Sequence, residues 1–133
     1  MLLGIKIVVG LFALLFALMG ANLMFNPAAA AEGFFLSPIG EAGLNNLRGD
    51  FGGMFIGCSL FLILGLVQNR GLWFQAVALL MALIAAGRLI GFALDGAPQS
   101  ASITAFAVEV VMAAVLVFAA GRLNTREVPI ASA

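Results

Sequence analysis

The residues of this sequence that could bind a ligand or transfer a proton stand within or beside long apolar stretches. Arg88 and Glu109 each lie inside such a stretch, and Arg48 and Asp50 stand at the start of another. A carboxylate beside an arginine can help to hold an anionic group or can act as a base. Because a lone charge is costly to bury in an apolar medium, we expect Arg88 and Glu109 to pair with each other.

The residue types that are missing limit the chemistry further. Histidine and tyrosine are absent, and Cys58 is the single cysteine, best explained as a small apolar filler. Histidine-ligated haem or zinc, a histidine general base and an intrachain disulfide are therefore excluded. We predict no catalytic residue, no metal site and no cofactor. Six basic and six acidic residues give a net charge of zero, which argues against a nucleic-acid partner.

Four apolar runs must position these side chains. They cover roughly 5–25, 48–68, 72–94 and 101–121, and each approaches the ~20 residues that a helix needs to cross ~30 Å of hydrocarbon. Of the 133 residues 64% are hydrophobic, against about 45 to 50% apolar residues in typical globular domains. The sequence therefore predicts an all-α protein, a four-helix transmembrane bundle that forms a single domain over 1–133.

The connection between the first two runs is the longest in the chain. Asn26 and Pro27 should end the first helix, and Ser37 with Pro38 should form the N-cap and first turn of the next. The intervening residues 28–36 are too apolar for a free loop. We therefore expect a short interfacial segment between the first and second helices, lying along the membrane surface.

The basic residues predict which side of the membrane holds the chain ends. Turn-forming residues at 68–71 and 95–100 reverse the chain, so the four runs alternate in direction. One side then carries most of the positive charge, while only Arg48 borders the other. By the positive-inside rule both termini should be cytoplasmic. The residues on the positive side are Lys6, Arg70, Arg122 and Arg126.

Helical rise brings the ionisable side chains to one depth. Counted from Trp73, Arg88 lies ~22 Å along a ~30 Å path, and counted down from Ala101, Glu109 lies ~12 Å below the same outer boundary. We expect a polar cavity there, in the outer leaflet, for a lipid head group or a small ligand. The alternative is that Arg88 and Glu109 only lock the helix order. The residues expected to bind the ligand are Arg48, Asp50, Arg88, Glu109, Asn46 and Asp95.

Small residues repeat at helical spacing and predict packing faces. Gly49, Gly53 and Gly57 form a small-xxx-small stripe, and Gly87 and Gly91 are spaced in the same way on the third run. Such residues let helix backbones approach closely in lipid. We expect these glycines to pack helices together, either within the chain or between copies of it.

A distinctive string of residues lies at the start of the second run. Residues 46–53 read Asn-Leu-Arg-x-Asp-x-Gly-Gly, and Gly87 with Arg88, 94–96, and Val108 with Glu109 follow it. These pieces resemble a family of small bacterial membrane proteins, domain of unknown function 4345, over nearly the whole chain. More weakly, the plan is similar to DoxX-type four-helix proteins. The resemblance implies a four-crossing protein of the bacterial inner (cytoplasmic) membrane and implies no activity.

Three hypotheses for function follow. The leading one is a non-enzymatic membrane protein that associates with membrane lipids, with copies of itself or with a larger membrane complex, and holds a lipid head group or small ligand in the outer cavity. The second is a small proton-coupled transporter or carrier in which Glu109 changes protonation beside Arg88. The third is a membrane enzyme on a lipid or quinone, with Asp50 or Glu109 as the base.

Overall fold

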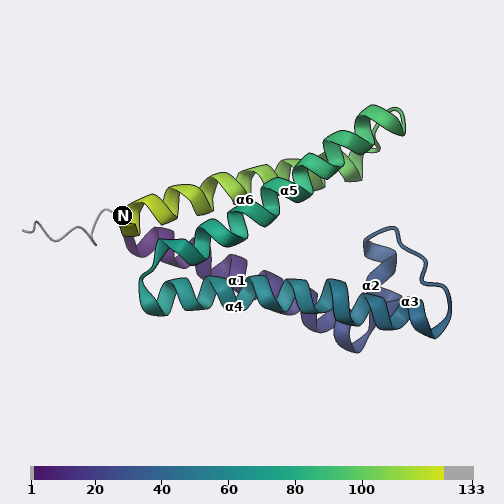
Figure 1. The fold of residues 1–133 in the computed structure, drawn as a ribbon, viewed down its shortest axis with the longest axis horizontal. Coiled ribbons are helices and arrows are strands. Elements are labelled where there is room, and N and C mark those ends of the chain that lie inside the picture. Colours follow the sequence, from purple (N-terminus) through teal and green to yellow (C-terminus); the bar gives the residue numbers. More distant parts are fainter. Residues whose placement is uncertain (1, 125–133) are drawn as a thin grey trace, which may run out of the picture. The chain divides into compact units, whose positions relative to one another are not determined.

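The computed structural model describes residues 2–124, and within them every regular element is a helix (Figure 1). Four helical stretches are long and apolar enough to cross a membrane, at Leu3–Phe25, Gly40–Gln68, Gly71–Leu94 and Ser100–Leu123. The predicted all-α fold with four apolar spans is confirmed. The elements are α1 (Leu2–Phe25), α2 (Pro27–Gly33), α3 (Gly40–Asn46), the π-helix η1 (Leu47–Gly52), α4 (Gly53–Gln68), α5 (Gly71–Leu94) and α6 (Ser100–Asn124).

Most helix ends fall where proline and turn residues stand in the sequence. Helix α1 ends at Phe25, and Pro27 occupies the first turn of α2, where a missing backbone N–H costs nothing. Helices α4 and α5 are separated only by Asn69 and Arg70, and Asn69 takes the left-handed φ of 53° that such a tight turn requires.

The predicted start of the second span was wrong. Ile39, not Ser37, is the N-cap residue of α3, which begins at Gly40 with a φ of 59° that favours glycine. Pro38 lies against the helix instead of starting it, since a Cβ at Gly43 would stand 3.1 Å from it. The helix begins after this reversal of the chain, so α3, η1 and α4 form one continuous stretch, longer than the expected 48–68.

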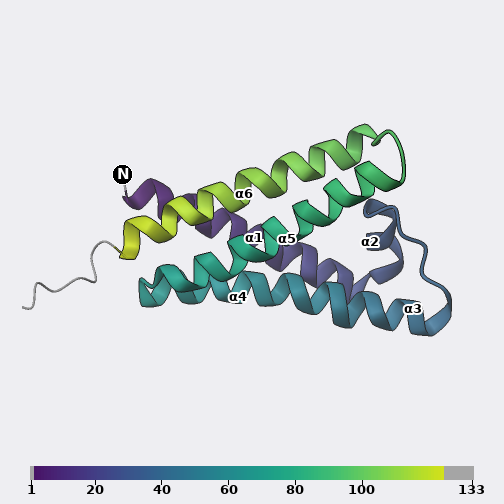
Figure 2. The same ribbon diagram turned by 45° about the horizontal axis from the view of Figure 1, so that its top comes forward.

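The chain folds into two compact units. The first unit holds residues 7–63, and the second holds the described parts of 1–6 and 64–133. In the first unit α1 packs against α4, as both views of the ribbon show (Figures 1 and 2). The rings of Phe16 and Phe55 lie 5.8 Å apart, and the buried Ser59 hydroxyl donates to the carbonyl oxygen of Ala13 at 2.8 Å.

The α1–α4 contact uses glycines other than those of the expected stripe. A Cβ at Gly20 would stand 2.9 Å from the backbone nitrogen of Ile56, and one at Gly52 would stand 2.9 Å from the Met24 side chain. By contrast, no described atom lies within 4 Å of a Cβ placed at Gly49, Gly53 or Gly57. Gly52 and Ser59 are seven residues apart, on one face of the helix, and this face rather than the stripe lies against α1.

In the second unit α5 and α6 pack along their length as an antiparallel pair (Figure 2). Buried residues follow helical spacing on both helices, and a Cβ at Gly65 would overlap the ring of Phe74. Gly87 makes no close contact of this kind, and Gly91 has only Asp95 near it. The buried positions are Phe74, Val77, Met81 and Ala85 on α5, and Met112, Leu116, Ala119 and Leu123 on α6.

Candidate functional site

An ion pair joins α5 to α6 in the second unit. The Nε of Arg88 donates to both carboxylate oxygens of Glu109, at 2.8 Å to Oε1 and 3.0 Å to Oε2. The Glu109 side chain is 12% exposed and that of Arg88 is 35% exposed. The predicted pairing of these two charges is confirmed.

The two apolar faces of α5 and α6 position the pair. Arg88 follows Ala85 on the buried side of α5, and Glu109 precedes Met112 on the buried side of α6. One turn farther along α5, Phe92 meets Phe106 of α6 edge to face, with ring centroids 5.9 Å apart. The ion pair therefore lies between the apolar α5–α6 core and a pair of phenylalanines.

The guanidinium of Arg88 has unused donors. It carries five N–H groups, and the contact with Glu109 engages only the one on Nε. No residue within 2–124 accepts a hydrogen bond from its two terminal amino groups, and neither is a fully buried, unsatisfied atom. These groups can reach water, a phosphate or another anionic group.

Arg48 contacts the backbone of α1, a contact that the sequence did not predict. Its Nε donates to the backbone carbonyl oxygen of Met24, at 3.1 Å, in the last turn of α1. The last four carbonyls of a helix have no partner inside the helix and carry its negative dipole end. Helix α1 has no basic residue in its own last turn, so Arg48 supplies the positive charge from elsewhere in the chain.

The other residues that were expected to bind the ligand make no side-chain hydrogen bond to Arg48 or Arg88. Asp50 and Asn46 are exposed, and their side chains hydrogen-bond to no residue in the described part of the chain. Asp95 stands at the C-cap of α5, where its backbone nitrogen donates to Gly91. Asp95 belongs with Arg88 and Glu109 to the second unit, and Arg48, Asp50 and Asn46 belong to the first. That all six line one cavity stays a prediction.

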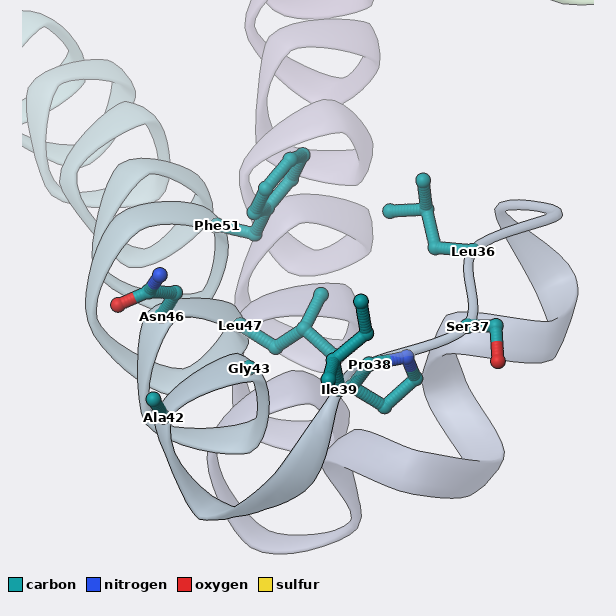
Figure 3. Close-up of a pocket in the computed structure, with 9 residues that line it drawn as sticks. All are labelled: Leu36, Ser37, Pro38, Ile39, Ala42, Gly43, Asn46, Leu47 and Phe51. Carbon is teal, nitrogen blue, oxygen red and sulfur yellow. The ribbon is translucent and has the colours of Figure 1, made fainter.

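Two hollows that sequence reasoning missed flank α3 in the first unit. The first, about 460 Å³, is mostly apolar (Figure 3). The second, about 570 Å³, is more polar and shares Ala42 with the first. The first is lined by Leu36, Ser37, Pro38, Ile39, Ala42, Gly43, Asn46, Leu47 and Phe51, and the second by Glu41, Ala42, Leu44, Asn45 and Arg48.

The α4–α5 turn gathers polar contacts in the second unit. Lys6 donates from Nζ to the side-chain oxygen of Asn69 at 2.6 Å, which brings the start of α1 to this turn. Trp73 donates from its indole nitrogen to Gln68 at 2.9 Å. Lys6 and Arg70 therefore lie at the same end of the unit, as their expected place on one membrane side requires. Arg126, predicted for that side too, lies outside the described residues.

The length and hydropathy of the four helices make this chain a multi-pass membrane protein. Residues 4–120 match the family described as Domain of unknown function (DUF4345), so the chain belongs to that family. The expected resemblance is confirmed over nearly the whole sequence. No curated protein and no solved structure matches the chain.

Proposed function

We propose that this protein is a non-enzymatic membrane protein that binds an anionic group at Arg88, either the phosphate of a lipid head group or a small anionic ligand. The observation that supports the proposal is the hydrogen bonding of the Arg88 guanidinium. Glu109 holds its Nε with both oxygens, and the two terminal amino groups have no acceptor among residues 2–124.

A fixed guanidinium suits a phosphate. Its planar fork of N–H groups matches the spacing of two phosphate oxygens, and a side chain that is already held loses little entropy on binding. Because the Arg88–Glu109 pair is formally neutral, hydrogen bonds rather than net charge would attract the ligand. Neutralising Glu109 should therefore tighten the binding of an anion, provided that the fold persists.

We further propose that the protein works as an oligomer or as an accessory component of a larger membrane complex. The open stripe of Gly49, Gly53 and Gly57 supports this, because no described atom lies within 4 Å of a Cβ at any of the three. Small residues with free space beside them let the backbone of a second helix approach closely.

We place the protein in the bacterial inner membrane with both termini in the cytoplasm. The contact between Lys6 and Asn69 supports this orientation, because it puts Lys6 at the same end as Arg70. Membrane lipids are the expected partners. A thiol-reactive, membrane-impermeant reagent applied to intact cells tests the orientation, with single cysteines introduced at Lys6 or Ser37 in a Cys58→Ser background. Ser37 should react and position 6 should not.

Native mass spectrometry of the gently purified protein tests the proposed binding. The wild type should retain an anionic lipid or take up added inorganic phosphate. Arg88→Gln should lose this ligand, whereas Glu109→Gln should hold it at least as strongly. Arg70→Gln is the matched control, because it removes an exposed arginine of the same unit.

Two results would overturn the proposal. One is a bare monomer that retains no lipid and takes up no phosphate. The other is a wild-type protein that transports protons in proteoliposomes, with transport abolished in Glu109→Gln, since that result would instead support the carrier hypothesis.

A further inference from the structure

Exposed apolar residues line or adjoin the mostly apolar hollow in the first unit. The segment between α2 and α3 exposes Phe35 at 76% and Ile39 at 90%, and Phe35 holds a left-handed φ of 56°. Ile39, Leu36 and Phe51 line this hollow, with Leu36 and Phe51 on opposite walls (Figure 3). A cavity of about 460 Å³ with such walls is within the usual size range of small-molecule sites and can take part of an acyl chain.

The neighbouring hollow carries one charge of each sign. Glu41 and Arg48 both line it, and their separation of seven residues puts them on one face of the helix. No ion pair joins them, although each is exposed. The Glu41 side chain has no hydrogen-bond partner within the described residues, and the Arg48 side chain uses only Nε, toward Met24. A carboxylate and a guanidinium fork therefore face the same hollow with free hydrogen-bonding groups.

We infer that these two neighbouring hollows, which share Ala42 in their walls, together bind one zwitterionic aminophospholipid, of the phosphatidylethanolamine class. Arg48 donates to its phosphate, Glu41 accepts from its ammonium group, and an acyl chain lies among Leu36, Ile39 and Phe51. The two charged residues start about 10 Å apart along the helix axis, a span that the head group and two long side chains cover together. Ala42, which borders both hollows, marks the path from head group to chain.

Charge complementarity selects this lipid over its relatives. A primary ammonium can donate hydrogen bonds to Glu41, whereas the quaternary ammonium of phosphatidylcholine cannot. An anionic lipid such as phosphatidylglycerol offers the carboxylate only neutral hydroxyl donors, and its net negative charge is repelled by Glu41. The site lies wholly in the first unit and does not depend on the proposed anion site at Arg88.

The test is competition among three lipids with identical acyl chains. The full chain in dodecyl maltoside is mixed with equal amounts of phosphatidylethanolamine, phosphatidylcholine and phosphatidylglycerol, and bound lipid is counted by native mass spectrometry. We expect phosphatidylethanolamine to bind about two- to fivefold more often than either competitor, the range that one exposed ion pair provides. Glu41→Gln should bring phosphatidylethanolamine close to parity with phosphatidylglycerol.

Control variants separate this site from others. Glu32→Gln removes an exposed carboxylate of α2 and should leave the lipid preference unchanged. The competition is also run in an Arg88→Gln background, so that lipid held at the proposed Arg88 site is not counted. Ile39→Asn, at a position too exposed to support the fold, should reduce the binding of all three lipids. Equal occupancy of the three lipids in the wild type would overturn the inference, and so would equal effects of Glu41→Gln and Glu32→Gln.

Discussion

The hydroxyl of Ser59 donates to the backbone carbonyl of Ala13 at 2.8 Å and ties α4 to α1 at a buried point. Interhelical hydrogen bonds of this kind contribute about 0.6 kcal/mol on average in membrane proteins, with a maximum near 1.7 kcal/mol. We expect Ser59→Ala to lower the free energy of unfolding by about that average, measured by reversible unfolding in mixed micelles. Ser102→Ala, at a half-buried site in α6, should change it less; an equal loss would mean that the contact with Ala13 adds nothing.

Gly20 is the tightest point of the α1–α4 contact. Its Cβ would stand 2.9 Å from the Ile56 backbone nitrogen and 3.0 Å from the Gly52 carbonyl oxygen, and backbone atoms cannot move aside cheaply. Gly20→Ala should therefore destabilise the protein by about 1 to 3 kcal/mol, the usual cost of overpacking. Gly10→Ala, on the same helix with open space around it, is the matched control and should be neutral or slightly stabilising. Similar unfolding curves for both variants would contradict this packing.

The Arg88–Glu109 ion pair should respond differently to single and double replacement. Glu109→Leu leaves Arg88 without its carboxylate beside an apolar core, and we expect a loss of about 1 to 3 kcal/mol, moderated because Arg88 is partly exposed. Arg88→Leu together with Glu109→Leu should recover much of that loss. A double-mutant cycle on unfolding free energies measures the coupling. Additive effects would show that the two charges do not stabilise each other.

Arg48 should protect the end of α1. Arg48→Gln removes the positive charge from the Met24 carbonyl, a contribution of about 0.3 to 1 kcal/mol at a helix C-terminus. Amides in the last turn of α1 should then exchange hydrogen up to about fivefold faster. Asp50→Asn, which removes an exposed charge two residues away, serves as the control. Unchanged exchange at 22–25 in Arg48→Gln would show that this contact does not hold the helix end.

Hydropathy, proline and turn residues were sufficient to predict the four long apolar helices, but not the start of the second, which lies at Gly40. A bilayer-length apolar stretch has few alternatives to a helix, so the four spans follow from composition alone. Pro27 and the turn residues after Gln68 and Leu94 restrict the backbone locally, and the helices end at these positions. The pairing of Arg88 with Glu109 was also predictable, because each charge is costly to bury without the other.

The contacts between distant segments were harder to predict. The partner of Arg48 is a backbone carbonyl, which every residue has, so no side chain in the sequence points to Met24. A possible signal was the lack of a basic residue in the last turn of α1. The contacts at Gly20 and Gly52, in place of the regular stripe, depend on which face of each helix turns toward the other, and glycine spacing alone does not specify that face.

The π-helix η1, Leu47–Gly52, lies within the string 46–53 that carries the family resemblance. Bonds from i to i+5 wind more residues into each turn than bonds from i to i+4. If side-chain directions around the helix axis are counted from Gly40 at a constant angle per residue, the count therefore gives the wrong directions in α4. Tolerance to substitution along this span should therefore follow two separate helical patterns. One ends before Leu47 and the other begins after Gly52, and the two do not share one phase.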